Sequence, residues 1–430
     1  MLIKNIRERL HFAQFCVLHR RALTVQNRWQ EKHLQRIVQH AYQHVPLWRT
    51  LLNRKGIDPS SIRTLEDFSV LPVTSKQTFL GRMVEEYIDN HRVLNSAWYV
   101  TSGTSGTPFR FLMKEQARVR KYADFASFRF LWWRGESIKS ALSARVAYIR
   151  VRGSSDDRHL FVPVEEFLRD PRGVLTTIEQ FKADIIATYP SILFDIARLL
   201  SRDPSLPRPT PRFLLSFGEM LEPSVRRLAT EVLGGEVYDR YGLEEIGVVG
   251  IECSMHGGFH VNTESVFVEI LEDGRDVVVC PNAAGRIIVT DLFNYGMPFI
   301  RYDTGDRGKI SYEPCACGLR SPRLWIEGRY SAYISLRGRR MHHLEFDAAM
   351  DGFMDRVFQY QIAKKTDGEI LARIIPGPGF HSGVLETVRE SLLKLVGDGV
   401  RVGVEAVERL PMTPRGKSRI LVDESFSPAS

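Results

Sequence analysis

The sequence predicts an α/β protein. We expect a large N-terminal domain of helix-covered, mostly parallel sheets with a small β region, followed by a small mobile α+β C-terminal domain. Between residues 144 and 250, apolar runs of strand length alternate with helical patterns, which is typical of parallel sheets covered by helices. From about residue 260 the pattern changes to short strands and turns, and the C-terminal part combines a hairpin, a helix and a further strand.

The first helical pattern lies within residues 1–50, where apolar residues recur at spacings of three and four and the pattern ends before Pro46. We interpret it as a helix that faces the core, in preference to a membrane-surface or partner helix. A second helical pattern covers residues 112–134.

Strand patterns follow over residues 144–149, 184–189 and 213–217, and the last two lead into a loop and a helix. Ligands of parallel sheets bind at the carboxyl ends of the strands, where such loops lie. We therefore expect ligand-binding residues in these loops.

The β region and the C-terminal domain have shorter strands. Residues 265–271, 275–279 and 286–291 predict a small barrel-like β region. The C-terminal pattern predicts a hairpin, a helix and a third strand over residues 356–363, 369–375, 382–396 and 400–407.

Composition and charge argue against nucleic-acid-binding, membrane-spanning, secreted and disulfide-rich classes of protein. The apolar and charged fractions are those of a globular protein that folds without a partner. The net charge is +8, but Lys and Arg are scattered, so we expect no nucleic-acid partner. The sequence has no apolar run that could span a bilayer, and polar residues interrupt any secretory signal, so it predicts a cytoplasmic protein. Five cysteines in so long a chain do not suggest a disulfide framework.

The segment Tyr99–Pro108 runs from two apolar residues into a loop of hydroxyl residues and glycines. The glycines let backbone N–H groups approach an anion, and the hydroxyls supply further donors. This composition favours a phosphate-binding loop, although a surface turn has a similar composition. The spacing fits neither a P-loop nor a dinucleotide fingerprint.

Four later segments decide between these readings: Tyr241–Glu245, Tyr302–Asp306, Gly328-Arg329 and Pro414–Lys417. Together with the loop, and in this order, they resemble the motifs of the adenylate-forming superfamily, which includes acyl-CoA synthetases. The short length, residues 34–42 and the Cys315-Ala316-Cys317-Gly318 turn resemble the phenylacetate–CoA ligase group, which includes CapK-like proteins.

The resemblance implies an AMP-binding domain over residues 1–328, β-rich and zinc-containing from about 251 to 328, and a lid domain over residues 329–430. It implies a ligase that activates a carboxylic acid with ATP, releases pyrophosphate and transfers the acyl group to CoA. An amine, a hydroxyl or a carrier protein as acceptor, and a non-catalytic nucleotide-binding scaffold, are the alternatives. A homodimer is a further arrangement that we keep open.

The resemblance also implies which residues bind ATP. The β- and γ-phosphates are held by Thr101, Ser102, Gly103, Thr104, Ser105, Gly106 and Thr107. Adenine and the acyl group lie along Ser216, Gly218 and Glu219. Adenine stacks on Tyr241, beside Gly242, and Asp239 accepts a hydrogen bond from its exocyclic amine.

Three further roles concern the reaction itself. Glu245 is the expected Mg²⁺ ligand, since Mg²⁺ prefers one or two carboxylates together with phosphate oxygens. Asp306 takes the ribose hydroxyls, and Arg329 contacts the ribose or a phosphate. Lys417 stabilises the charge that develops between the carboxylate and the α-phosphate. Taken singly, Asp306 could be a turn residue, Tyr241 a core aromatic and Glu245 an acid at a helix N-terminus.

Cysteine and histidine spacing predicts a structural zinc site. Cys315 and Cys317 stand one residue apart in a turn, and Cys253 and His260 supply two further ligands. His256 competes with His260 for the fourth place, and free thiols are the alternative to a zinc site. Such a site would be closed and non-catalytic.

The sequence departs from the superfamily pattern at three positions. Glu244 stands where a hydroxyl residue is usual, and Ser331 and Ala332 replace an Asp pair after Gly328-Arg329. These changes are compatible with adenylation but put the later transfer to CoA in doubt.

Overall fold

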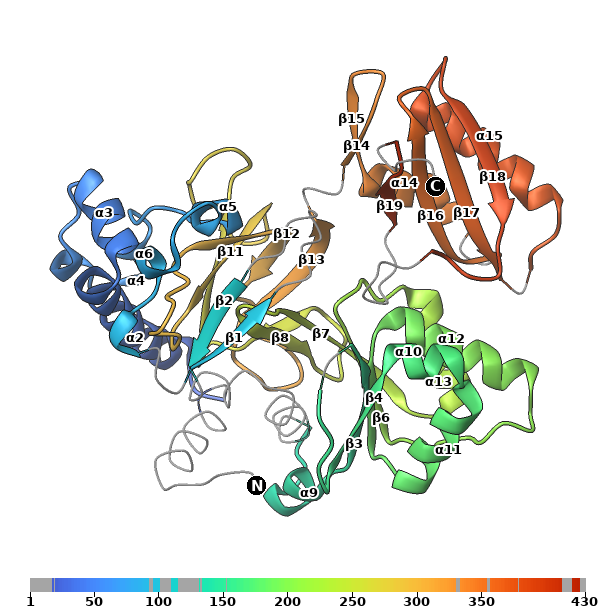
Figure 1. Ribbon diagram of the computed structural model, residues 1–430, viewed down its shortest axis with the longest axis horizontal. Coiled ribbons are helices and arrows are strands. Elements are labelled where there is room, and N and C mark those ends of the chain that lie inside the picture. The colour runs from blue at the N-terminus through green and yellow to red at the C-terminus, as the bar shows by residue number, and fades with distance from the viewer. Residues whose placement is uncertain are drawn as a thin grey trace. The chain divides into compact units, whose positions relative to one another are not determined.

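The computed structural model describes residues 18, 20–92, 96–100, 110–114, 131, 134–151, 153–329, 333–353, 356–377, 379–411 and 420–425. The chain divides into two compact units. Unit 1 comprises Met1–Ala144 and Tyr238–Glu327, and unit 2 comprises Arg145–Val237 and Gly328–Ser430. The elements of both units are drawn in Figure 1. None of the helices in the described part of the chain is both long and apolar enough to cross a membrane.

Unit 1 combines one long helix, α2, and several short ones with a sheet. Its helices are α2 (Leu23–His44), α3 (Pro46–Arg54), α4 (Leu65–Phe68), α5 (Lys76–Phe79), α6 (Val84–Tyr87) and α9 (Ile138–Ser143), with 3₁₀ turns η1 (Pro59–Ser61) and η2 (Asn90–Arg92). Its strands are β1 (Ser96–Val100), β2 (Arg110–Lys114), β7 (Glu236–Leu243), β8 (Gly247–Glu252), β9 (Phe259–Val261), β10 (Val266–Leu271), β11 (Ala284–Asp291), β12 (Tyr302–Ser311) and β13 (Arg323–Arg329).

These strands form a sheet in the order β10-β11-β12-β13-β9-β8-β7. β1 and β2 form a separate antiparallel pair, with Val100 opposite Arg110. The predicted β content is therefore confirmed, but the strands form an open sheet instead of a barrel-like region. The sheet includes two long strands, β12 and β13, that the strand pattern did not reveal.

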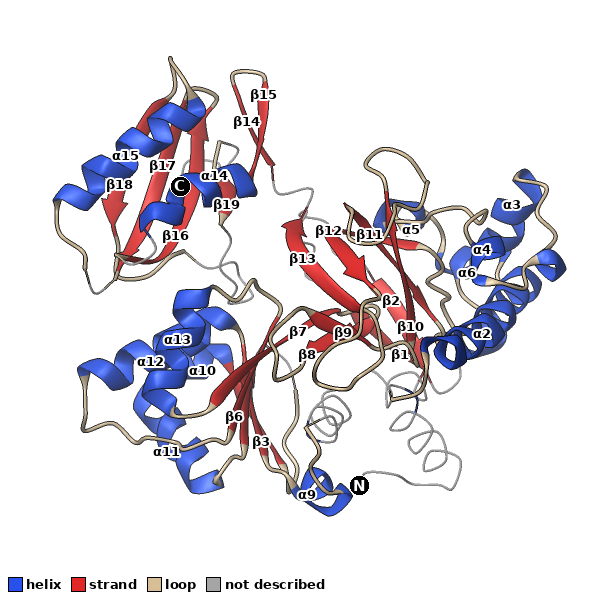
Figure 2. Ribbon diagram, turned by 180° about the vertical axis from the view of Figure 1, so that it is seen from behind, coloured by secondary structure: helices blue, strands red, loops and turns tan. Residues whose placement is uncertain are grey.

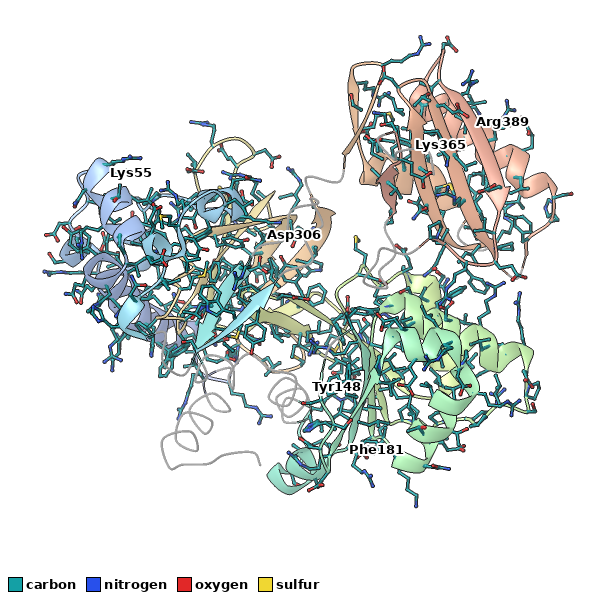
Figure 3. All side chains as sticks on the ribbon, viewed as in Figure 1. Lys55, Tyr148, Phe181, Asp306, Lys365 and Arg389 are labelled. Atoms are coloured by element: carbon teal, nitrogen blue, oxygen red, sulfur yellow. The ribbon has the colours of Figure 1, made fainter. Side chains whose placement is uncertain are left out.

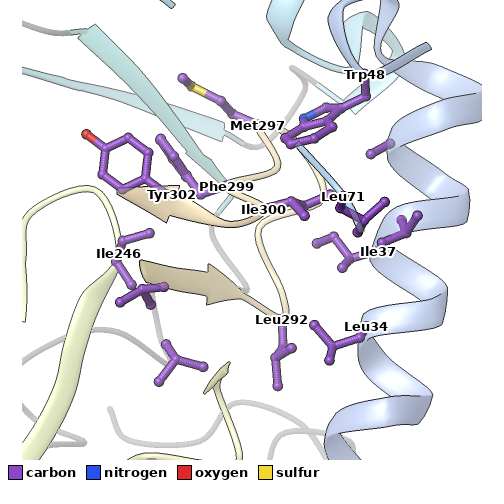
Figure 4. Close-up of a cluster of buried hydrophobic side chains, with 14 of the residues drawn as sticks. Leu34, Ile37, Trp48, Leu71, Ile246, Leu292, Met297, Phe299, Ile300 and Tyr302 are labelled. Atoms are coloured by element: carbon purple, nitrogen blue, oxygen red, sulfur yellow. The ribbon is translucent and has the colours of Figure 1, made fainter. Parts of the chain in front are cut away.

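Helix α2 covers part of this sheet and confirms the predicted core-facing helix. Leu34 and Ile37 are buried, and they face Leu71, Leu292 and Ile300 in the close-up of the core (Figure 4). The helix ends at His44 and a new one begins at Pro46, because proline cannot donate the hydrogen bond that would continue the first helix.

Unit 2 contains the predicted parallel sheet. Its strands are β3 (Val146–Arg150), β4 (His159–Pro163), β5 (Ile185–Thr188) and β6 (Phe213–Phe217), in the order β6-β5-β3-β4, and each adjacent pair is parallel. Its helices are α10 (Val164–Arg169), α11 (Pro171–Phe181), α12 (Pro190–Arg202) and α13 (Pro223–Leu233). They lie on one side of the strands (Figure 2). The α/β fold class is confirmed.

The rest of unit 2 is the predicted α+β region. It consists of β14 (Tyr333–Leu336), β15 (Arg339–His342), α14 (His343–Met350), the 3₁₀ turn η3 (Asp351–Phe353), β16 (Val357–Thr366), β17 (Glu369–Pro376), α15 (Gly383–Val396), β18 (Arg401–Ala406) and β19 (Leu421–Asp423). β16 and β17 form the predicted hairpin, and β19 and β18 add to its two sides in parallel. The division of the chain into domains at residues 328 and 329 stays a prediction.

Two predicted elements were wrong in the described residues. Residues 112–114 belong to strand β2 instead of beginning a helix. Residues 275–279 form no strand, and only Val278 makes a bridge, to Leu271. Arg275 and Asp276 instead bind Arg286 through a backbone carbonyl and a carboxylate.

Glu424 anchors the last described strand to the hairpin. Its two carboxylate oxygens accept hydrogen bonds from the guanidinium of Arg373 at 2.8 and 3.2 Å, and Lys365, labelled in Figure 3, also pairs with it. The hydrogen bonds from Arg373, ahead of that from Lys365, lower the pKa of Glu424 to about 2.

This lowered pKa predicts a pH-dependent stability. The folded pKa lies below the usual value of 4.5, so the ionised carboxylate stabilises the fold above pH 4.5, and this contribution is lost as the pH falls towards about 2. We expect Glu424→Gln to lower the midpoint temperature of unfolding at neutral pH, and the difference from the unaltered protein to shrink across this acidic range. The control is Glu386→Gln, which removes an exposed pair with Arg389. A difference that stays constant with pH would contradict the assignment.

Candidate functional site

Several predicted site residues lie outside the described residues. These are the loop residues Thr101, Ser102, Gly103, Thr104, Ser105, Gly106 and Thr107, together with Ser331, Ala332 and Lys417. The strands that flank the loop are described. β1 and β2 pair antiparallel, so a strand follows the loop, at the residues where the helical pattern of 112–134 was predicted to begin.

The structure brings together the two segments that begin with Tyr241 and Tyr302. The hydroxyl of Tyr241 donates to Oδ2 of Asp306 at 2.7 Å, and the hydroxyl of Tyr302 donates to Oε1 of Glu245 at 2.9 Å. The tyrosine of each segment thus binds the carboxylate of the other. Two predicted nucleotide ligands and the predicted Mg²⁺ ligand are fixed by this exchange.

Glu245 lies in the turn between β7 and β8, where Gly242 is the partner of Val248. Its residue is 8% exposed. The alternative that it is an acid at a helix N-terminus was wrong, because residues 244–246 form a turn between strands. A carboxylate has about four lone-pair sites, so accepting the bond from Tyr302 is compatible with Glu245 also binding a cation.

Gly242 has a packing reason to be glycine. A Cβ built at this position would lie 2.5 Å from the backbone oxygen of Gly247. Any side chain would therefore push β7 and β8 apart at the turn that holds Glu245.

Asp306 lies in an irregular part of β12, where the pairing with β11 shifts register between Arg286 and Ile288. Gly305 has a φ of +76°, which glycine adopts without strain. The backbone N–H of Gly305 donates to Oδ1 of Asp303 at 3.0 Å, and that of Asp306 donates to the Thr304 hydroxyl at 3.0 Å. Asp303 is itself bound by Arg286 at 2.8 Å. These hydrogen bonds therefore fix the position of Asp306, which is labelled in Figure 3.

The residue before Tyr302, Arg301, forms a buried ion pair with Glu269. Arg301, whose residue exposure is 0%, lies 3.0 Å from Glu269 and also donates to the backbone oxygens of Ser69 and Leu71. Burial raises the pKa of Glu269, and Arg301 opposes that rise. Arg301 has a φ of +44°, a backbone conformation that is uncommon for residues other than glycine.

Asp239 lies on β7, two residues before Tyr241. Its backbone N–H donates to Oε2 of Glu252 at 2.8 Å, and its own Oδ1 accepts from the backbone N–H of Arg240 at 2.9 Å. The ring of Tyr241 lies 6.2 Å from that of Phe259, centroid to centroid.

In unit 2, the predicted residues follow β6. Ser216 is buried, and Gly218 has a φ of +82°. The carboxylate of Glu219 accepts hydrogen bonds from the backbone N–H of Ser191 at 3.0 Å and from its hydroxyl at 3.1 Å. Glu219 therefore caps the first turn of α12 and joins the carboxyl ends of β5 and β6, where ligands of parallel sheets bind.

Arg329 is the last residue of β13, and the glycine before it, Gly328, has a φ of +108°. Glycine adopts this backbone conformation without strain, so the strand reaches Arg329 through a position that favours glycine.

The predicted metal ligands lie together. The four ligand atoms of Cys253, His260, Cys315 and Cys317 are all within 4.8 Å of one another. Sγ of Cys253 lies 3.8 Å from Sγ of Cys315, and Sγ of Cys317 lies 3.3 Å from Nε2 of His260. A tetrahedral zinc with Zn–S bonds of about 2.3 Å needs sulfur–sulfur separations of about 3.8 Å, so the donor set fits zinc.

The surroundings of these ligands also suit a metal. The second ring nitrogen of His260, Nδ1, lies 3.2 Å from the carbonyl oxygen of Ser321, a contact that orients a ligating histidine. A hydrogen bond from Cys317, ahead of one from His260, lowers the pKa of Cys253, which favours the thiolate, the form that binds metals. His256 instead contacts Glu252, with Nδ1 3.3 Å from Oε2.

Sequence reasoning missed Tyr302, Arg301, Glu269 and Glu252. Tyr302 opens the Tyr302–Asp306 segment, so its position was available as a signal. Glu252 directly precedes Cys253, but nothing in the sequence joins it to Asp239. Arg301 and Glu269 carried no signal, because their pairing depends on the adjacent strands β10 and β11 and the loop after β11.

Comparisons with known proteins agree on one group. No family model matches the chain. The phenylacetate–coenzyme A ligase of Thermus thermophilus is 25% identical over 353 residues, which is 79% of this chain and 78% of that protein. The phenylacetate–coenzyme A ligase of Aromatoleum evansii is 23% identical over 413 residues, which is 90% of this chain and 91% of that protein.

A solved structure agrees in fold. The 2-hydroxyisobutyryl-CoA ligase in complex with R3-HIB-AMP, in its postadenylation state, has a TM-score of 0.76 at 20% identity and covers 95% of this chain and 91% of that chain. At this identity the likeness concerns the fold. Together with the curated relatives, it shows that the chain is similar in sequence to phenylacetate–CoA ligases and shares the fold of a solved CoA ligase.

Proposed function

We propose that this chain is an AMP-forming acid–thiol ligase that converts a carboxylic acid and ATP into an acyl-adenylate and pyrophosphate, then transfers the acyl group to CoA. The observation that carries the proposal is the exchange of hydrogen bonds between Tyr241 and Asp306 and between Tyr302 and Glu245. It holds two motifs of the superfamily in one place. The names of the curated relatives favour phenylacetate or a similar arylacetic acid as the substrate.

Residue roles follow from the chemistry of the side chains. Asp306 would accept both ribose hydroxyls, and its bond from Tyr241 fixes the direction of its carboxylate. Glu245 would hold Mg²⁺, which supplies positive charge to the phosphates when bound. Lys417 would stabilise the developing charge, and Thr101–Thr107 would bind the β- and γ-phosphates. The other nucleotide-binding residues keep the roles that the resemblance implies.

The test is ATP–pyrophosphate exchange with aryl, arylacetic, fatty and amino acids, in the absence of CoA. We expect exchange with one class of acid, and AMP release coupled to thioester formation once CoA is added. Exchange without thioester formation would favour an amine, a hydroxyl or a carrier protein as the acceptor. No exchange with any acid, despite ATP binding by calorimetry, would favour a non-catalytic scaffold.

We further propose that Cys253, His260, Cys315 and Cys317 hold a structural zinc ion. Its support is the compact donor set and the contact of His260 with Ser321. Zinc would join the β8–β9 turn to the turn after β12, and would contribute its binding free energy to the stability of unit 1.

Removing one ligand tests the zinc site. We expect about one zinc per chain in the purified protein, and well below one in Cys315→Ser, with a lower unfolding temperature because the metal's stabilisation is lost. The matched control is Cys280→Ser, because Cys280 is exposed and does not belong to the cluster. Full zinc content in Cys315→Ser, or none in the unaltered protein, would contradict the site.

Three expectations from the sequence have no counterpart in the described structure or the comparisons. A cytoplasmic location, a homodimer and a carrier-protein partner therefore remain predictions.

A further inference from the structure

A continuous series of hydrogen bonds joins the proposed zinc site to the nucleotide-binding strand β7. The carbonyl oxygen of Cys253 accepts from the backbone N–H of His256 at 3.0 Å. Nδ1 of His256 lies 3.3 Å from Oε2 of Glu252, and the same oxygen accepts from the backbone N–H of Asp239 at 2.8 Å. Asp239 in turn binds the N–H of Arg240.

The residues in the middle of this series, His256 and Glu252, have further contacts or are buried. His256 has a φ of +48°, and its ring lies 4.9 Å from that of Tyr238, whose hydroxyl is hydrogen-bonded to Arg134. Glu252 and Asp239 are 7% and 8% exposed. When a polar group buried to this degree loses its hydrogen-bond partner, the folded state is destabilised, because water does not replace the partner. A change at the Cys253 turn therefore has a cost at Asp239.

Glu252 and Cys253 are adjacent residues with different partners. Glu252 ends β8 and binds Asp239 on β7, whereas the thiol of Cys253 lies in the metal cluster. Two residues beyond Asp239, Tyr241 binds Asp306. A short series of contacts within unit 1 thus connects the proposed zinc site to the proposed nucleotide site.

We propose that zinc binding and nucleotide binding are thermodynamically coupled, with His256 and Glu252 as the positioning residues that join the two sites. The inference rests on the proposed function, and it adds that the zinc supports the geometry of the nucleotide site. By linkage, a metal that tightens nucleotide binding is itself bound more tightly when the nucleotide is present. Coupling of this kind typically amounts to about 5- to 150-fold.

The test measures AMP affinity by calorimetry on the full chain, zinc-loaded and chelator-stripped. AMP is the probe because the triphosphate of ATP itself binds Zn²⁺. We expect at least about 5-fold weaker AMP binding without zinc, and zinc affinity in competition with a chromogenic chelator that rises by the same factor when AMP is added.

His256→Asn separates coupling from zinc binding. Asparagine tolerates the positive φ but is too short to reach Glu252. We expect the zinc-loaded variant to keep about one zinc per chain and to bind AMP as weakly as the stripped protein does. The matched control is His91→Asn, because His91 lies in η2, outside this series, and it should retain the full coupling.

The outcomes are distinguishable. Equal AMP affinity with and without zinc, or full coupling in His256→Asn, overturns the inference and leaves the proposed function intact. A protein that binds zinc but neither AMP nor ATP overturns the nucleotide site as well. A protein that binds AMP but no zinc overturns the zinc site and the coupling together.

Discussion

Lys417→Ala is expected to lower the rate of acyl-adenylate formation by about 10²–10³-fold, while ATP affinity changes little. The proposed role of Lys417 is to meet negative charge that develops between the carboxylate and the α-phosphate in the transition state. Removing one such preorganised group typically costs a factor of this size in rate. Because the charge is smaller in the ground state, ATP binding depends on the lysine far less. The measurement is single-turnover adenylate formation at saturating acid and ATP.

The control for this variant is Lys394→Ala, a lysine near the end of α15 in the same unit. This variant also removes one positive charge from unit 2. If net charge alone mattered, adenylate formation would slow equally in Lys394→Ala and Lys417→Ala. A fall of less than tenfold in Lys417→Ala would contradict the proposed role. Supplying preformed acyl-adenylate tests the second step separately, and we expect transfer to CoA to continue in Lys417→Ala.

The sequence predicted which four side chains lie together in the candidate metal cluster, because two of them are neighbours in one turn. Cys315 and Cys317 share one turn, and thiolates so close together have few structural roles other than metal binding. The choice of His260 over His256 could not be settled from spacing. It depends on β9, which pairs with β8 and β13 and directs His260 into the cluster, whereas His256 lies in the turn before β9 and contacts Glu252.

The carboxylates of the nucleotide site were also predictable, but their partners were not. Glu245 and Asp306 lie in recognisable motifs, whereas the hydrogen bonds from Tyr302 and Tyr241 join residues 57 and 65 positions apart. Such contacts follow from strand order, which a single sequence does not contain. The same holds for the segment 112–114, which belongs to a short apolar run that does not separate a strand from a helix until its pairing with β1 is known.

The buried pair of Arg301 and Glu269 predicts the largest loss of stability. We expect Glu269→Ala to lower the free energy of unfolding by about 3–5 kcal/mol, because it leaves the Arg301 guanidinium buried without its counter-ion. Arg301 directly precedes Tyr302, which lies in the same hydrophobic cluster as Ile300 and Phe299 (Figure 4). If Arg301 moves after losing its counter-ion, the hydrogen bond from Tyr302 to Glu245 should therefore also be disturbed.

A double variant, Glu269→Leu with Arg301→Met, distinguishes a buried unpaired charge from a simple loss of packing. Burial raises the pKa of Glu269 even beside Arg301, so the cost of removing both charges from water offsets much of their attraction. Apolar residues of similar volume should therefore recover most of the stability that Glu269→Ala loses. Urea unfolding of the three proteins gives the comparison. A double variant as unstable as Glu269→Ala would mean that the hydrogen bonds from Arg301 to Ser69 and Leu71, which methionine cannot make, account for the loss.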